Sequence, residues 1–273
     1  MESLLLKKQI YGDVIKKNLR KTFFILFFIC SLPDNSLASV NRNLTVFAEQ
    51  NTVAALTKLS RIYSQKNHVI VAVNFNSSAE LISDIDSGEP ADIFISAHTG
   101  WIETLKQKGL VDVYNTGHIA RDKMVLVTSK DNHNINANLK NSNLTIEEAL
   151  KILDQQKAYL IIDQEGSSSG KYSKELVKSL ELNNLQLFTK LSEDKSEALD
   201  LTGDNVEHYA ILLKSQIKNK KNLQVLAEQK DSNIFYQALV IAGDNMETAR
   251  EFLKFLKSNA AKSILRDNGF ITD

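Results

Sequence analysis

A strand–helix–strand unit in the first half of the chain constrains the fold more than any other feature. Residues 69–73 form an unbroken apolar run, which is typical of a strand buried on both faces. Beyond it, Ser77 and Glu80 have the Ser-x-x-Glu spacing that predicts a capping box at the start of a helix. Residues 88–90 end that helix, and residues 93–95 begin a second buried strand. Because the free N–H groups of a helix N-terminus attract anions, the unit predicts an anion-binding turn.

Strands and helices alternate along the rest of the chain. Further apolar runs predict strands at residues 44–48, 124–128, 159–163, 208–213 and 235–242. This alternation favours an α/β fold with parallel sheets that helices cover on both faces. Several helices are expected to begin at a Ser or Asn that follows a strand: Asn51, Ser77, Ser169 and Ser192. Such turns line the ligand crevice of open α/β sheets, so they predict an anion site between two lobes.

Charge and cysteine content argue against several other functions. The 33 basic and 33 acidic residues of the 273-residue chain cancel, so bulk charge does not favour a nucleic-acid partner. The five histidines show no metal-ligand spacing, and the single cysteine, Cys30, gives them no partner. We therefore expect neither a metal nor another cofactor.

The first 38 residues have the order of a secretory signal. Four basic residues within 16–21 precede an apolar run at 22–32, and residues 36–38 supply the small side chains of a cleavage site. The apolar run is shorter than the roughly 20 residues of a membrane span. Residues 1–38 are thus predicted to be a cleaved signal peptide that sends the mature protein to the periplasm. The alternative is an uncleaved N-terminal anchor.

Four segments together resemble one family. They are residues 44–48, the Ser77–Ser78 pair, the Gly-x-Pro-Ala-Asp-Ile-Phe-Ile-Ser run at 88–96 and the Asn-Gly-Phe at 268–270. The chain from Leu44 onward is similar to the periplasmic molybdate-binding proteins of ABC importers. That resemblance implies a two-lobed type II periplasmic-binding-protein fold of the α/β class. Each lobe would be a mostly parallel sheet flanked by helices.

The resemblance also implies where the lobes divide. The first lobe would comprise residues 39–123 and 239–273, and the second lobe residues 124–238. The hinge would consist of two crossing segments, near 124–128 and 235–242.

The family holds a tetrahedral oxyanion with neutral donors, namely serine hydroxyls, backbone N–H groups and a tyrosine hydroxyl. Carried onto this chain, the first family serine falls at Asn51 and the second at Ser78. The backbone donors of the second lobe fall at Ser169 and Lys195. The resemblance therefore implies a monomeric, non-enzymatic binding protein that captures molybdate or tungstate and delivers it to the membrane permease of an ABC importer.

Departures from the family pattern leave another ligand open. The family tyrosine is replaced by Leu213, although Tyr209 lies close by on the same predicted strand. Losing a hydrogen bond to a charged group costs about 1.5–3 kcal/mol. Lys171 and Lys195 are candidates for added positive charge. Sulfate, phosphate or a small organic acid remains the alternative ligand.

A serine hydrolase is a further alternative. Residues 166–170 match the Gly-x-Ser-x-Gly pattern, with Ser168 as nucleophile, Asp194 or Asp204 as acid and His208 as base. However, three residues separate this motif from the preceding strand, whereas a nucleophile elbow turns directly off its strand. The binding function is therefore favoured.

Overall fold

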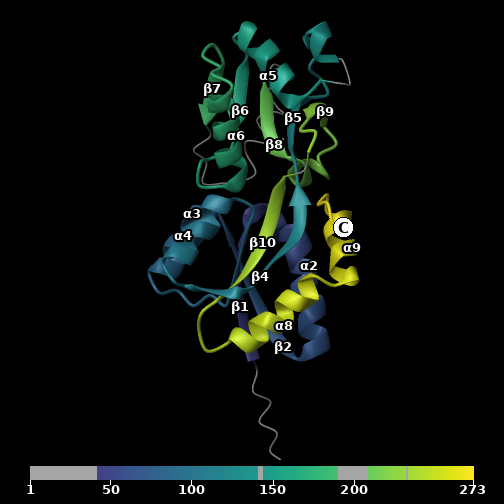
Figure 1. The fold of residues 1–273 in the computed structure, drawn as a ribbon. Coiled ribbons are helices and arrows are strands. Elements are labelled where there is room, and N and C mark those ends of the chain that lie inside the picture. The colour runs from purple at the N-terminus through teal and green to yellow at the C-terminus, as the bar shows by residue number, and fades with distance from the viewer. Residues whose placement is uncertain (1–41, 141–143, 190–207, 232) are drawn as a thin grey trace, which may run out of the picture. The chain divides into compact units, whose positions relative to one another are not determined.

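The computed structural model describes residues 42–140, 144–189, 208–231 and 233–273 (Figure 1). The chain divides into two units, Met1–Val40 and Asn41–Asp273, and all described residues belong to the second. The predicted signal peptide therefore lies outside the described residues. None of the described helices is long and apolar enough to cross a membrane.

Two five-stranded sheets organise the described residues. The first has the spatial order β2-β1-β3-β10-β4, with β1 (Arg42–Glu49), β2 (Val69–Asn76), β3 (Ile93–Ser96), β4 (Val111–Asp122) and β10 (Ile234–Ile241). The second has the order β7-β6-β8-β5-β9, with β5 (Met124–Ser129), β6 (Tyr159–Ile162), β7 (Gln186–Thr189), β8 (Tyr209–Leu213) and β9 (Leu223–Glu228). The predicted two-sheet α/β organisation is confirmed.

Both sheets mix parallel and antiparallel pairs, whereas the sequence predicted mostly parallel ones. β1 runs parallel to β2 and β3, but β10 runs antiparallel to β3 and β4, which lie on either side of it. In the second sheet β6 is parallel to β7 and β8, while β5 is antiparallel to β8 and β9. The antiparallel pairs in each sheet involve strands beside the two crossings, where the chain leaves one sheet for the other.

The chain crosses between the sheets at two points. Lys123 alone separates β4 from β5, so the first crossing lies directly before the predicted segment 124–128. The second predicted segment, 235–242, lies almost wholly within β10, which belongs to the first sheet from Ile234 onward. The second crossing therefore precedes Ile234, and the predicted lobe boundary at residue 238 falls inside a strand. The continuous apolar run of β10 gives the sequence no sign of where the sheet changes.

Helices connect the strands. The α-helices are α2 (Val53–Asn67), α3 (Ser78–Asp86), α4 (Thr99–Gln107), α5 (Ile146–Gln155), α6 (Ser168–Ser179), α8 (Met246–Leu256) and α9 (Asn259–Asp267). The described residues also form three short 3-10 helices: η1 (Gln50–Thr52), η2 (Ala137–Lys140) and η3 (Lys214–Ile217).

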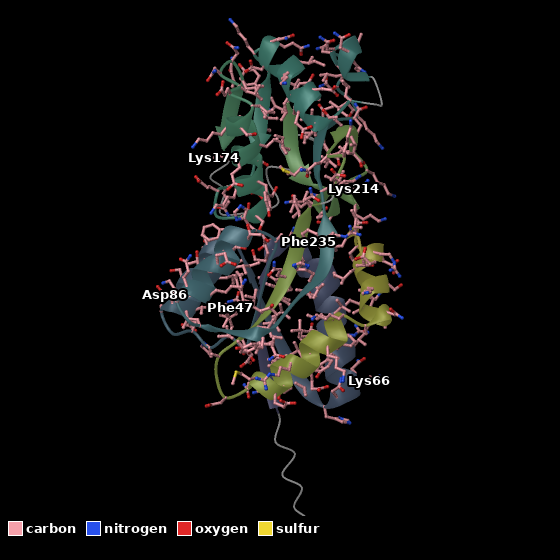
Figure 2. The ribbon with its side chains drawn as sticks, viewed as in Figure 1. Phe47, Lys66, Asp86, Lys174, Lys214 and Phe235 are labelled. Carbon is pink, nitrogen blue, oxygen red and sulfur yellow. The ribbon has the colours of Figure 1, made fainter. Side chains whose placement is uncertain are left out.

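Neighbouring residues of β1 pack on opposite faces of the first sheet, as the strand period of two requires. Leu44 joins a buried cluster with Leu56 of α2 and Phe252 of α8. Phe47, labelled in Figure 2, joins a separate cluster with Leu81 of α3. Helices thus cover both faces of this sheet, which is why apolar residues of β1 are buried on both faces.

The predicted capping box at the start of α3 is present, and α5 begins with a second one. The Ser77 hydroxyl accepts from the N–H of Glu80, and the Glu80 carboxylate accepts from the N–H of Ser77. Thr145 and Glu148 exchange the same two hydrogen bonds at the start of α5. An N-cap of this kind stabilises its helix by about 1 kcal/mol. The first of them also fixes the helix end that borders the candidate site.

Candidate functional site

The N-termini of α3 and α6, which belong to different sheets, contact each other. Ser77 caps α3, and Ser167 caps α6 by accepting from the N–H of Gly170 at 3.0 Å. The N–H of Ala79 donates to the carbonyl oxygen of Gly166 at 3.1 Å, which joins the two helix ends directly. Each helix N-terminus carries a partial positive charge. Two positive ends are therefore brought together where the two sheets meet.

A cavity of about 400 Å³ lies beside these helix ends. Its polar lining comes from both sides and includes Glu49, Asn51, Ser77, Asp163, Ser169 and Lys220. A volume of this size is within the range of small-molecule sites, roughly 300–1,000 Å³. The cavity is therefore the candidate solute site.

Ser169, a predicted site residue, lies on the cavity wall. Its side chain is buried, with 2% of the residue exposed, and its hydroxyl has no hydrogen-bond partner among the described residues. Nor does any described residue accept from the N–H of Ser169 or of Ser78. Buried polar groups in proteins are nearly always hydrogen-bonded, so an open hydroxyl on a cavity wall indicates a place for a ligand atom.

Ser78, the second predicted site residue, lies in a buried row of hydroxyls and is absent from the cavity lining. Its Oγ is 2.8 Å from Ser96 Oγ at the end of β3. Ser96 Oγ in turn is 3.4 Å from Ser168 Oγ at the start of α6. The row therefore links the two sheets through three serine side chains.

Asn51 lines the cavity, but it does not cap a helix as the sequence predicted. It lies within η1, and its side-chain amide donates to the hydroxyl of Tyr236 on β10. The preference for a long-range partner overrides the local cap: α2 begins at Val53 after Thr52, without a side-chain cap. The amide oxygen of Asn51 has no partner among the described residues. Tyr236 is a buried hydroxyl that the sequence did not reveal.

The remaining residues considered from the sequence add no described polar group to the cavity. Lys195 lies outside the described residues. Leu213 is buried in β8 opposite Met124 of β5 and contributes no polar group. The ammonium of Lys171 lies 4.2 Å from the ring centroid of Trp101, an ordinary cation–π contact. The predicted positive charge of Lys171 is thus engaged with an aromatic ring.

Glu49, the last residue of β1, is the functional candidate that sequence reasoning missed. Only 3% of it is exposed, and it lines the cavity. Its Oε1 accepts from the N–H of Ser168 at 2.5 Å, and its Oε2 accepts from the Ser168 hydroxyl at 2.7 Å. Oε2 also accepts from the N–H of Ala97 at 3.3 Å. A carboxylate of the first sheet thus occupies the helix end of the second. The only local signal was an acidic residue directly after the predicted strand at 44–48.

Burial favours the neutral forms of three acidic groups at or beside the cavity, Glu49, Asp163 and Tyr236. Burial raises the pKa of Glu49 although its hydrogen bonds to Ser168 and Ala97 act in the opposite direction. Burial also raises the pKa of Asp163, which lines the same cavity. Burial and the nearby carboxylates raise the pKa of Tyr236 well above its usual value. The cavity is therefore a place where charge is costly.

The structure does not assemble the predicted hydrolase site. The Ser168 hydroxyl donates to Glu49, and Ser168 itself is fully buried. β6 and β8 run parallel, with Leu160 opposite Tyr209, so His208 lies at the entry ends of these strands. Ser168 follows their exit ends, about 13 Å away along a four-residue strand. The two predicted acids lie outside the described residues.

Comparison with known families adds to this geometry. Residues 44–271 match the family described as bacterial extracellular solute-binding protein. The chain belongs to this family. Among its relatives is the molybdate-binding protein ModA of Haemophilus influenzae, which is 26% identical over 243 residues. The matched region covers 85% of this chain and 91% of that relative.

Solved structures show the same fold. The tungstate ABC transporter protein of Geobacter sulfurreducens superposes with a TM-score of 0.67 at 17% identity, covering 82% of this chain and 98% of that one. The sulfate-binding protein SubI of Mycobacterium tuberculosis superposes with a TM-score of 0.64 at 16% identity, covering 84% and 86%. This solute-binding protein thus has the predicted type II periplasmic-binding-protein fold, and the family to which it belongs is extracellular.

Proposed function

We propose that this protein captures a tetrahedral oxyanion, molybdate or tungstate, and delivers it to the membrane permease of an ABC importer. The observation that carries the proposal is the meeting of two capped helix N-termini from different sheets beside a polar cavity. Helix N-termini stabilise an anion through their N–H groups and their dipoles, without a full counter-ion. Two such ends fit an anion with oxygens on opposite sides.

The residues take separate roles in this proposal. Ser169 contributes its open hydroxyl and its N–H from α6. Ser78 contributes its N–H and hydroxyl from α3, and that hydroxyl turns from Ser96 toward the anion when the anion binds. Asn51 contributes its backbone N–H, since its amide is engaged with Tyr236. Lys195 contributes a backbone N–H from the second lobe, as the resemblance implies.

The relatives support an oxyanion but include more than one. One is named for molybdate, one for tungstate and one for sulfate. The cavity also has room for an oxyanion that carries a small organic group. We therefore expect molybdate and tungstate to bind, with sulfate, phosphate and small organic acids as the competitors to test.

The test is direct binding. A thermal-shift screen of these anions on the purified mature protein, followed by equilibrium dialysis with elemental analysis, gives affinity and stoichiometry. Ser169→Ala should weaken binding of the preferred anion about tenfold, since a hydrogen bond to a charged group is worth at least 1.4 kcal/mol. Ser78→Ala should have an effect of similar size.

Ser179→Ala is the matched control. Ser179 is an exposed serine at the far end of α6, and its hydroxyl bonds only to the carbonyl oxygen of Leu176 among the described residues. It should bind the anion as wild type does. Absence of any oxyanion binding at millimolar concentration would refute the proposal, and so would equal affinities for all four proteins.

The proposal includes the location and assembly. Residues 1–38 would be removed on export, and the mature protein would work in the periplasm as a monomer without nucleic acid.

A further inference from the structure

The carboxylate of Glu49 already occupies the helix end at which a solute anion would bind. Its Oε1 accepts from Ser168 N–H, the first N–H of α6, and Ser169 is the next residue of that helix. Its Oε2 accepts from Ala97 N–H of the first sheet, so one carboxylate joins both sides. In effect the chain supplies a tethered anion of its own beside the cavity.

We infer that Glu49 determines when the site can be filled: the protein takes up one proton at Glu49 with each oxyanion that it captures. The inference rests on the proposed function. Two groups of like charge on one helix end, in a site of low polarity, strongly disfavour each other. A dianion therefore binds beside Glu49 only after the carboxylate has been neutralised.

The proton balance is simple. A proton from solvent adds to one carboxylate oxygen, and the site loses one negative charge before the dianion enters. The other oxygen still accepts from Ser168 N–H, while the new O–H becomes a donor to an oxyanion oxygen. A residue that repels the solute when ionised thus becomes a ligand for it when neutral.

The groups around Glu49 favour this protonation. Asp163 follows β6 and lines the same cavity, and its charge raises the pKa of Glu49 further. The pKa of Tyr172 on α6 is raised to about 12 by burial, and that of Tyr236 on β10 is also raised, so neither adds charge near neutral pH. Lys220 is the positive group on the cavity wall. The largest cause of the raised pKa of Glu49 is its burial.

The experiment measures proton uptake and affinity together. Wild type is titrated with molybdate by calorimetry in buffers of different ionisation enthalpy, from about pH 6.5 to 8.5, where molybdate remains a dianion. At pH values at which Glu49 of the free protein is ionised, we expect the protein to take up one proton for each anion bound. In that range the affinity for the anion should fall about tenfold for each unit by which the pH rises. Glu49→Gln should bind more tightly than wild type at the upper end, without proton uptake and without a pH slope.

Glu175→Gln is the matched control. It removes the same charge from α6 at a contact with His98 that is outside the cavity lining. It should keep the slope and the proton uptake of wild type. If Glu49→Gln does not fold, as judged by circular dichroism, the proton count of wild type still tests the inference, because binding without proton uptake refutes it.

The outcomes separate the two proposals. Wild-type binding without proton uptake overturns the role of Glu49 and leaves the proposed function intact. An unchanged pH slope in Glu49→Gln also overturns it, because a group other than Glu49 would then be taking up the proton. If neither wild type nor Glu49→Gln binds any oxyanion, the proposed function fails and the inference fails with it.

Discussion

Asp122, the last residue of β4, should make the protein less stable as pH rises. It is completely buried at the first crossing, where its carboxylate accepts from the N–H of Lys123 at 2.8 Å and from that of Ser215 at 3.3 Å. Burial raises its pKa from 3.8 to about 6, and the hydrogen bonds from Ser215 and Lys123 offset only part of that effect. The folded protein therefore holds this proton more tightly than the unfolded chain does.

The sign and size follow from linkage. A raised pKa contributes stability that is fully present below the unfolded value and is lost as pH rises through the folded value. A shift of about two units, at 1.36 kcal/mol per unit, corresponds to about 3 kcal/mol lost between roughly pH 4 and pH 6. About half of the loss should be complete by roughly pH 5.

Asp122→Asn removes the titration and keeps a side-chain oxygen for Lys123 N–H. Relative to wild type, its free energy of unfolding should rise by up to about 3 kcal/mol from pH 4 to pH 7.5. Replacing the second carboxylate oxygen by an NH2 group has a free-energy cost that does not depend on pH. This cost cancels when the difference in free energy of unfolding between variant and wild type is compared at different pH values. Urea unfolding at four pH values, followed by both circular dichroism and the fluorescence of Trp101, measures it and tests for two-state behaviour.

Asp86→Asn serves as the control, because Asp86 is exposed and pairs with Lys108 on the surface. Solvent screens such a pair, so the substitution should change the stability difference by less than about 1 kcal/mol. A difference between Asp122→Asn and wild type that does not vary with pH, or that falls as pH rises, would refute the reasoning.

Two further predictions concern packing and export. Gly170→Ala would place a Cβ only 2.1 Å from the carbonyl oxygen of Gln164, so it should lower the free energy of unfolding by more than about 2 kcal/mol. Gly243→Ala meets no atom within 4 Å and should stay within about 0.5 kcal/mol of wild type in the same urea assay. The protein isolated from the cell envelope should begin within a few residues of Ser39; an intact mass that includes residues 1–38 would contradict this.

Local features of the site were predictable because their causes are local. The capping box of α3 depends on Ser77 and Glu80, three residues apart, and the structure has it as predicted. The serine-rich turn before α6 is likewise readable from the sequence, although the helix is capped by Ser167 and does not begin at Ser169 as expected. β4 was not predicted, because polar residues interrupt its twelve positions and its pairing with β10 depends on a distant strand.

The sequence did not reveal the role of Glu49, because its hydrogen-bond partners are distant along the chain. Its partners Ala97 and Ser168 lie 48 and 119 residues away, and no spacing rule joins positions so distant. A distant partner also decides the hydrogen bond of Asn51. Its sequence neighbours favoured a helix cap, yet its side-chain amide donates to Tyr236, 185 residues away. In this fold the polar groups of the site come from both sheets, so their partners are set by how the sheets meet. A family resemblance can therefore carry donors onto this chain, but it cannot reveal a new carboxylate placed among them.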